Sequence, residues 1–215
     1  IHSVRFGLES KVFTDRQSDL KNAETKFEIS IENSHSDDFD VEVIWERDEV
    51  VNPFEPSERR PDITIPAGTY DFVSAKASVR TSRSRKLQGQ VDFEGGSFYT
   101  GDKYTLSLQT AIKPSGRFNL EAEYETNWLR MPEGNVSVQF VNTRMTYSFT
   151  TDLFVKLFAQ WNNEDELASF NFLANYRYRP GSDIFLVYDN AFGTVSGFED
   201  RNRALLLKVS YLLGL

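Results

Sequence analysis

The fold class is decided by one stretch of ten residues, Ser169-Phe170-Asn171-Phe172-Leu173-Ala174-Asn175-Tyr176-Arg177-Tyr178. Aromatic and small apolar residues occupy its even positions, and polar residues occupy most of its odd positions. Because successive side chains of a β-strand point to opposite faces, this alternation predicts a strand with one apolar and one polar face. The turn residues Pro180, Gly181, Ser182 and Asp183 follow directly and precede a second apolar run. The sequence therefore predicts a β-hairpin here.

The same two-residue period recurs along most of the chain. Between Phe118 and Trp128, apolar residues alternate with Asn and Glu. Burying so many polar groups in a soluble core would be too costly, so we expect the polar face to contact water. About twelve such segments, an even number, predict an all-β fold: an antiparallel, up-and-down transmembrane β-barrel. The final run, Leu205 to Leu215, is apolar at every second position and resembles the closing strand of an outer-membrane barrel.

Three segments interrupt the alternation. Near Val73, and again near Asn142, the apolar residues change parity, and we interpret the first change as a β-bulge. Between Asp48 and Ala67, four prolines exclude a helix or a paired strand over most of the segment. We expect this segment to be the longest loop, external to the barrel, and to contact a partner or fold inward.

Connection lengths add a second signal for a barrel. Tight connections are predicted at Lys113–Gly116, Thr150–Asp152 and Pro180–Asp183. Longer ones are predicted in alternation with them, at Asp48–Ala67, Leu129–Asn135, Asn162–Glu166 and Asp189–Asn202. Short periplasmic turns and longer external loops would produce this alternation.

Composition narrows the classes of protein. The 215 residues are 40% hydrophobic and 26% charged, with a mean hydropathy of −0.46 and no apolar run of helix-spanning length. A transmembrane strand needs only about ten residues, half of them apolar. The chain has no Cys, which excludes disulfides and thiol sites, and its net charge of −8 argues against a nucleic-acid partner. It begins at Ile1 without Met or a signal peptide. We therefore expect a fragment, with 1–215 forming the C-terminal part of one larger barrel domain.

Polar rows on the predicted strands are the candidate ligand-binding residues. A selective pore lining and simple cross-strand charge pairing inside a filled lumen explain these rows equally well. The candidate lumen-facing residues are Lys76, Arg80, Gln88, Gln90, Asp92, Glu94, Glu121, Glu123 and Glu125.

Signals for catalysis or metal binding are weak. The two histidines are His2 and His35, and the Ser/Asp residues beside His35 lie in the same turn, where they do not form a catalytic triad. Asn163, Glu164 and Asp165 are candidates for divalent ions at a lipopolysaccharide surface, although a solvated loop is the better interpretation. The sequence predicts no cofactor.

Aromatic residues fall near the predicted strand ends. They suit interfacial girdles of a barrel or, equally, the core of a soluble sandwich. The residues are Trp45, Tyr70, Phe98, Tyr99, Trp128, Trp161, Tyr178 and Tyr188.

Several motifs, taken in order, resemble the DUF5916 family of outer-membrane barrels. They are Asn52-Pro53-Phe54, Ile65-Pro66-Ala67-Gly68-Thr69-Tyr70, Gly96-Ser97-Phe98-Tyr99-Thr100-Gly101, Met131-Pro132-Glu133-Gly134, Gln160-Trp161-Asn162, Arg179 to Tyr188 and Asn202-Arg203-Ala204-Leu205. Members of this family carry a carbohydrate-binding domain similar to family 9 modules before the barrel. The resemblance implies that this chain is the last portion of such a barrel, without the sugar-binding module.

Three hypotheses about function follow. The first is a non-enzymatic barrel of the outer membrane of a Gram-negative bacterium that passes, anchors or assembles something at the cell surface and is linked to polysaccharide. Its partners would be membrane lipid, lipopolysaccharide, polysaccharide and a protein that fills or covers the lumen. The second is a glycan-processing enzyme whose active site lies mostly outside this chain. The third is a soluble all-β binding module.

Overall fold

A computed structural model describes residues 1–14, 20–194 and 199–213, and the regular elements among them are β-strands. Twelve strands form one sheet in the order of the sequence, with β1 and β12 at its two ends. This confirms the predicted all-β, up-and-down arrangement, and the described residues form one sheet rather than the two of a sandwich. No helix among these residues is long and apolar enough to cross a membrane. The strands are β1 (Ser3–Thr14), β2 (Leu20–Glu32), β3 (Asp38–Val50), β4 (Gly68–Arg80), β5 (Leu87–Phe98), β6 (Gly101–Ser115), β7 (Phe118–Met131), β8 (Gly134–Ser148), β9 (Leu153–Asn162), β10 (Leu167–Arg179), β11 (Ser182–Gly193) and β12 (Glu199–Val209).

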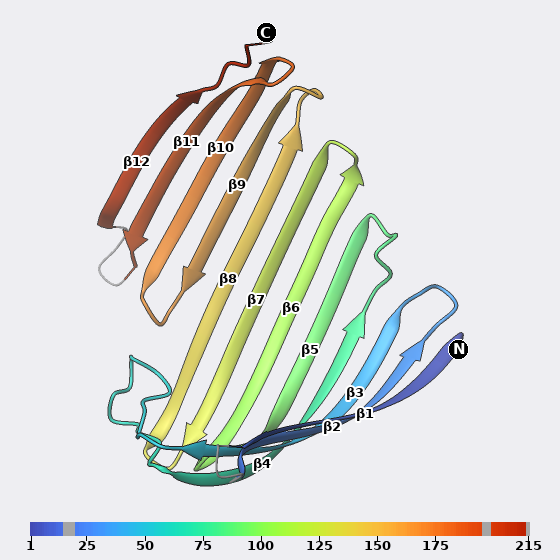
Figure 1. Ribbon diagram of the computed structural model, residues 1–215, viewed down its shortest axis with the longest axis vertical. Helices are drawn as coiled ribbons and strands as arrows, with labels where there is room; N and C mark the ends of the chain where they lie inside the picture. Colours follow the sequence, from blue (N-terminus) through green and yellow to red (C-terminus); the bar gives the residue numbers. More distant parts are fainter. Residues whose placement is uncertain (15–19, 195–198, 214–215) are drawn as a thin grey trace. The chain divides into compact units, whose positions relative to one another are not determined.

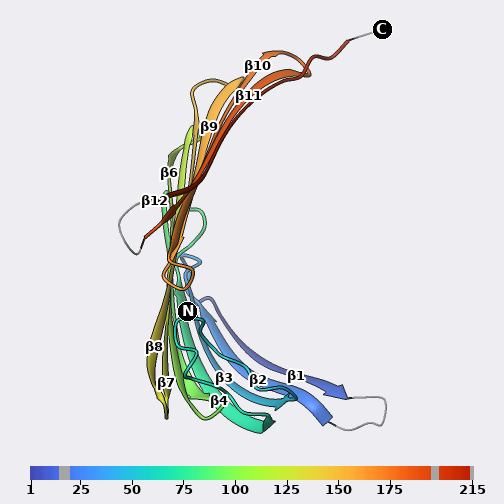
Figure 2. The ribbon, with the colours of Figure 1, turned by 90° about the vertical axis from the view of Figure 1, so that its left-hand side faces the viewer.

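The chain divides into two compact units. In the first, β1 to β4 lie side by side and bend in the same direction (Figure 2). In the second, β9 to β12 lie side by side (Figure 1). The first unit comprises Ile1–Arg83, Gly89–Leu108 and Glu125–Val138, and the second comprises Ser84–Gln88, Gln109–Tyr124 and Gln139–Leu215.

Strand register gives the sheet two chemically different faces. Phe27 pairs with Val43 and Val43 with Ala75, whereas the adjacent Glu28 pairs with Glu42. We call these sides of the first unit the apolar face and the polar face. The second unit repeats the pattern: Phe172, Tyr188 and Leu205 are paired across β10, β11 and β12, and Asn171, Asp189 and Ala204 are paired on the other side. The two-residue period of the sequence therefore fixes which side chains share a face.

At both places where the apolar residues change parity, they move from one face of the sheet to the other while the strand pairing continues. The predicted bulge near Val73 is therefore wrong. β3 and β4 pair without interruption from Asp38 with Arg80 to Val50 with Gly68. Val73 is 49% exposed on the apolar face, and Phe72 is 9% exposed on the polar face. Near Asn142, the pairing of β8 with β9 is also continuous from Phe140 to Ser148. Register shifts occur instead at Phe13/Thr14, Arg177/Arg179 and Ala191/Phe192.

The predicted alternation of connection lengths is wrong as a general rule. The Asp48–Ala67 loop is confirmed as the longest connection, with bounds 51–67, but the expected Leu129–Asn135 loop is a two-residue turn. Connections after odd-numbered strands span 15–19, 51–67, 99–100, 132–133, 163–166 and 194–198. Those after even-numbered strands span 33–37, 81–86, 116–117, 149–152 and 180–181.

Candidate functional site

Six of the predicted ligand-binding residues lie on β4 and β5. Lys76 pairs with Glu94 and Arg80 pairs with Gln90, so these residues share the polar face of the first unit. Arg80 Nε donates to Gln90 Oε1 at 2.7 Å, and Gln90 Nε2 donates to Asp92 Oδ2 at 2.7 Å. Five of the six candidates are therefore neighbours on one surface, tied by cross-strand pairing. The sixth, Gln88, turns its side chain to the backbone carbonyl of Arg85 at 3.1 Å.

The three candidate glutamates of β7 also share one side of their strand, and each accepts a hydrogen bond from an amide. This arrangement spreads the carboxylates along the strand. The contacts are Asn119 with Glu121 at 2.9 Å, Gln109 with Glu123 at 3.3 Å and Asn127 with Glu125 at 2.8 Å.

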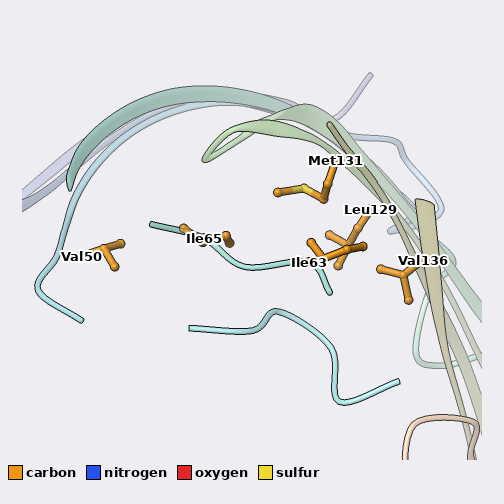
Figure 3. Close-up of a cluster of buried hydrophobic side chains, with 6 residues drawn as sticks. All are labelled: Val50, Ile63, Ile65, Leu129, Met131 and Val136. Carbon is orange, nitrogen blue, oxygen red and sulfur yellow. The ribbon is translucent and has the colours of Figure 1, made fainter. Parts of the chain in front are cut away.

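The sequence did not predict an apolar cluster on the polar face of the first unit. Ile63 and Ile65, from the 51–67 loop, are completely buried against side chains of β3, β7 and β8 (Figure 3). The loop is itself ordered as a small hairpin, since Phe54 and Ile65 exchange backbone hydrogen bonds at 3.2 and 2.8 Å. The hypothesis that this loop folds inward thus gains a structural basis: it covers the polar face. The cluster comprises Val50, Ile63, Ile65, Leu129, Met131 and Val136.

Tyr99 is the centre of an aromatic group beside this cluster. Its ring meets those of Phe54, Tyr70, Phe72 and Phe98 with centroids 4.7 to 5.4 Å apart, mostly edge to face. Its backbone has a positive φ of 49° in the turn between β5 and β6. Burial, together with the hydrogen bond from its hydroxyl to a carboxylate, raises the pKa of Tyr99 well above the ordinary value. A strained tyrosine therefore joins the loop to three strands.

That carboxylate belongs to Asp48, which accepts a hydrogen bond from the Tyr99 hydroxyl at 2.7 Å. Its other oxygen accepts a hydrogen bond from Asn22 at 2.5 Å. Asp48 therefore fixes the end of β3 immediately before the loop begins.

Arg60 fastens the tip of the loop to the turn between β7 and β8. It donates to the backbone carbonyl oxygens of Asn135 at 3.0 Å and Glu133 at 3.4 Å, and it pairs with Asp62 at 2.7 Å. The guanidinium lowers the pKa of the Asp62 carboxyl. At Gly134 the φ is 144°, and a Cβ there would lie 2.7 Å from Arg60 Nη2. Glycine is favoured here because residues with a Cβ rarely adopt this positive φ.

Four motifs that suggested a family come together in this part of the first unit. Residues 52–54 and 65–70 form the base of the loop, where Tyr70 Oη donates to the carbonyl of Pro66 at 2.8 Å. Residues 96–101 supply Tyr99, and residues 131–134 supply Met131 and the turn that binds Arg60. The motifs thus have a structural role in holding the loop on the sheet.

Three of the eight predicted girdle residues do not lie on the apolar face. Tyr70, Phe98 and Tyr99 pack against the buried cluster beneath the loop. Trp45 and Trp128 remain on the apolar face, where Arg47 lies 5.8 Å from the centre of the Trp45 ring. Aromatic content alone could not separate these two environments.

The predicted turn Pro180–Asp183 forms hydrogen bonds with the residues that follow β12. Gly181 has a φ of 76°, and Ser182 Oγ accepts a hydrogen bond from the Leu212 amide at 3.0 Å. Asp183 and Ser210 exchange backbone hydrogen bonds of 2.8 and 3.2 Å. β12 ends at Val209, so the prediction that the closing strand runs on to Leu213 is wrong, and Leu215 lies outside the described residues.

The acidic turn between β9 and β10 is stabilised by hydrogen bonds between its own residues. Asn162 Nδ2 donates to Asp165 Oδ2 at 2.9 Å, and the Asp165 amide donates back to Asn162 Oδ1 at 2.7 Å. Asn163 Oδ1 accepts a hydrogen bond from the Gln139 amide at 2.7 Å. Nowhere in the described part of the chain do three His, Asp or Glu side chains lie where they could hold a metal ion.

Comparisons with known proteins give little further guidance. No protein-family model matches the chain, and no curated protein matches it. A solved NanC porin structure matches at 12% identity over 90% of this chain and 94% of that chain, with a TM-score of 0.37. The fold is defined by the pairing of the twelve strands in sequence order.

Proposed function

We propose that this chain is part of a transmembrane β-barrel of the bacterial outer membrane and serves as a pore, anchor or assembly component at the cell surface. The exposed apolar face carries the proposal. Phe6 and Leu8 of β1 are 71% and 76% exposed, and Leu205 and Leu207 of β12 are 70% and 66% exposed. Apolar patches of this extent mark a surface that binds protein or lipid. In the proposed barrel, lipid tails contact the apolar side of the strands in both units.

Strand length and backbone pairing support the same proposal. The strands have 10 to 15 residues, and a tilted strand crosses a bilayer with about 9 to 11 residues. A paired sheet satisfies its backbone groups internally, as the hydrocarbon region demands. Within the proposal, β1 and β12 find strand partners when the barrel closes, either with each other or with strands of a longer chain.

The polar face supports a water-filled interior. It carries charged side chains that pair across strands, such as Lys11 with Glu24 at 3.2 Å and Lys26 with Glu42 at 3.9 Å. The 51–67 loop covers part of this face, so in the proposed barrel it narrows or closes the interior. The polar residues beside the loop would then contact whatever passes, or a protein that covers the opening.

We also propose that the chain belongs to the DUF5916 barrels and that its partners at the surface are lipopolysaccharide and polysaccharide. The support is the order of the motifs and the convergence of four of them around one loop. The chain would then supply the barrel, and the binding of sugar would reside in a module outside it.

Reconstitution tests the location directly. Trp45, Trp128 and Trp161 all lie on apolar sides of their strands, so brominated lipid should quench most of the tryptophan fluorescence of protein folded into vesicles. Folded protein should also migrate faster on a gel before boiling than after it. A protein that stays soluble without detergent and is not quenched would contradict the proposal.

A further inference from the structure

We propose that the polar face of β2 and β3 binds multivalent cations. Three pairs of carboxylates lie directly opposite each other between these two strands: Glu24 with Glu46, Glu28 with Glu42 and Glu32 with Asp38. We call these six residues the acidic strip. The binding itself rests on the first unit alone; a role in selecting what passes through a pore rests on the proposed function.

Opposed like charges are unusual in a sheet. Directly paired residues have Cβ atoms about 4.5 to 5.5 Å apart, and like charges at this distance destabilise the pairing. Lys26 lies 3.3 Å from Glu28 and 3.9 Å from Glu42, and Lys11 lies 3.2 Å from Glu24. Arg5 of β1, paired with Ser30, is a third cation on this face. Three cations do not balance six carboxylates.

Two further cations lie on the next strand, β4, where Lys76 is paired directly with Glu42 and Arg80 with Asp38. Lys76 pairs with Glu94 on its far side, and Arg80 donates its Nε hydrogen to Gln90. On this face, Glu94 and Asp92 add two more carboxylates. The neighbouring strand therefore leaves the excess of negative charge on this surface in place.

A row of four polar residues crosses the strip, and two of them carry buried oxygen atoms without a hydrogen-bond partner. Ser30 pairs with Asp40, Asp40 with Ser78 and Ser78 with Asp92. Ser78 is 6% exposed and Asp92 is 8% exposed, and neither Ser78 Oγ nor Asp92 Oδ1 has a hydrogen-bond partner. An unsatisfied buried oxygen is costly, and a ligand that donates hydrogen bonds removes the cost. Amines and the water shell of a metal ion are both such donors.

The geometry limits the class of cation. Within the described ranges, no three acidic or histidine side chains are placed to hold a bare metal ion. The ligand therefore binds through N–H or O–H donors rather than by direct coordination. Polyamines and hydrated Mg²⁺, which keeps most of its waters, share this chemistry and more than one positive charge.

Calorimetric titration tests the proposal on folded protein in detergent, with spermidine and Mg²⁺ as separate probes. The variant is Glu28→Gln with Glu42→Gln, which removes the central pair. We expect wild type to bind at least one probe and the variant to bind it about thirtyfold more weakly, since two lost charge contacts at a hydrated surface contribute about 1 kcal/mol each. The matched control, Glu55→Gln with Glu133→Gln, removes two exposed carboxylates that lie outside the strip and should stay within about twofold of wild type.

The outcomes distinguish the two proposals. Binding of spermidine alone assigns the strip to amines, and binding of Mg²⁺ alone assigns it to hydrated ions. No binding of either probe by wild type, or equal binding by wild type and the Glu28/Glu42 variant, overturns the inference. Failure of the membrane proposal would appear separately, as a lack of lipid quenching. Heat-sensitive gel mobility confirms that each variant is folded, and removing opposed like charges should not weaken the sheet.

Discussion

Tyr99 shows how much of the loop attachment depends on one side chain. Its hydroxyl donates to Asp48 at 2.7 Å, and its ring contacts four others. Tyr99→Phe keeps the ring contacts and removes the hydrogen bond to a charged acceptor, so we expect a loss of about 1.5 kcal/mol in the free energy of unfolding. Denaturant titration of both proteins measures it. Equal stability would show that water replaces the hydroxyl without cost.

The same residue predicts a dependence on alkaline pH. Because the folded-state pKa of Tyr99 is raised, its contribution to stability is complete below about 10, the pKa of an ordinary tyrosine, and is lost as pH rises through the higher folded-state value. Absorbance titration should therefore show a tyrosine that ionises late in wild type and is missing from Tyr99→Phe. If the tyrosine that is missing from Tyr99→Phe ionises near pH 10, as an ordinary tyrosine does, the hydroxyl is not held by Asp48.

At the scale of single elements, the 51–67 loop is a folded unit held by its isoleucines. Ile65 is completely buried, whereas Val51 at the start of the loop is 73% exposed. Ile65→Ala should cost about 2 to 5 kcal/mol of local stability because it leaves a cavity, and Val51→Ala should cost less than about 0.5 kcal/mol. Limited trypsin digestion after Arg59 measures the release of the loop. Equal resistance of both variants would mean that Ile65 does not hold the loop on the sheet.

The strands were predictable from the sequence and the loop attachment was not, for a physical reason. Alternation such as Phe27, Glu28 and Ile29 reports which face a residue takes within its own strand. It does not report what covers that face. The parity change near Val73 therefore appeared to be a bulge, although Phe72 is an apolar residue placed on the polar face, where it packs against Tyr99. The proline content located the loop, but its burial depends on side chains far apart in the sequence.

The candidate polar residues show the same limit. Periodicity placed Lys76, Arg80, Gln90 and Glu94 on one face, and their cross-strand pairing follows once the register is known. The opposed carboxylates of β2 and β3 were present in the sequence as alternating Glu and Asp. Only the register shows that Glu28 lies opposite Glu42 rather than opposite a lysine. Register depends on the turn at 33–37, which composition marks as a turn without fixing its length.

At the scale of the whole molecule, the apolar face predicts how the protein responds to a new charge. Val43 lies in the middle of β3 on this face and is 46% exposed. In water, Val43→Arg at such an exposed site would change the free energy of unfolding by less than about 0.5 kcal/mol. Near the middle of a bilayer, the same change costs about 2 to 4 kcal/mol. Denaturant titration of protein folded into vesicles therefore distinguishes lipid from water around this residue. Val51→Arg, in the exposed part of the loop, is the matched control and should be neutral. If both variants are neutral, the apolar face does not contact lipid, and another protein surface must cover it.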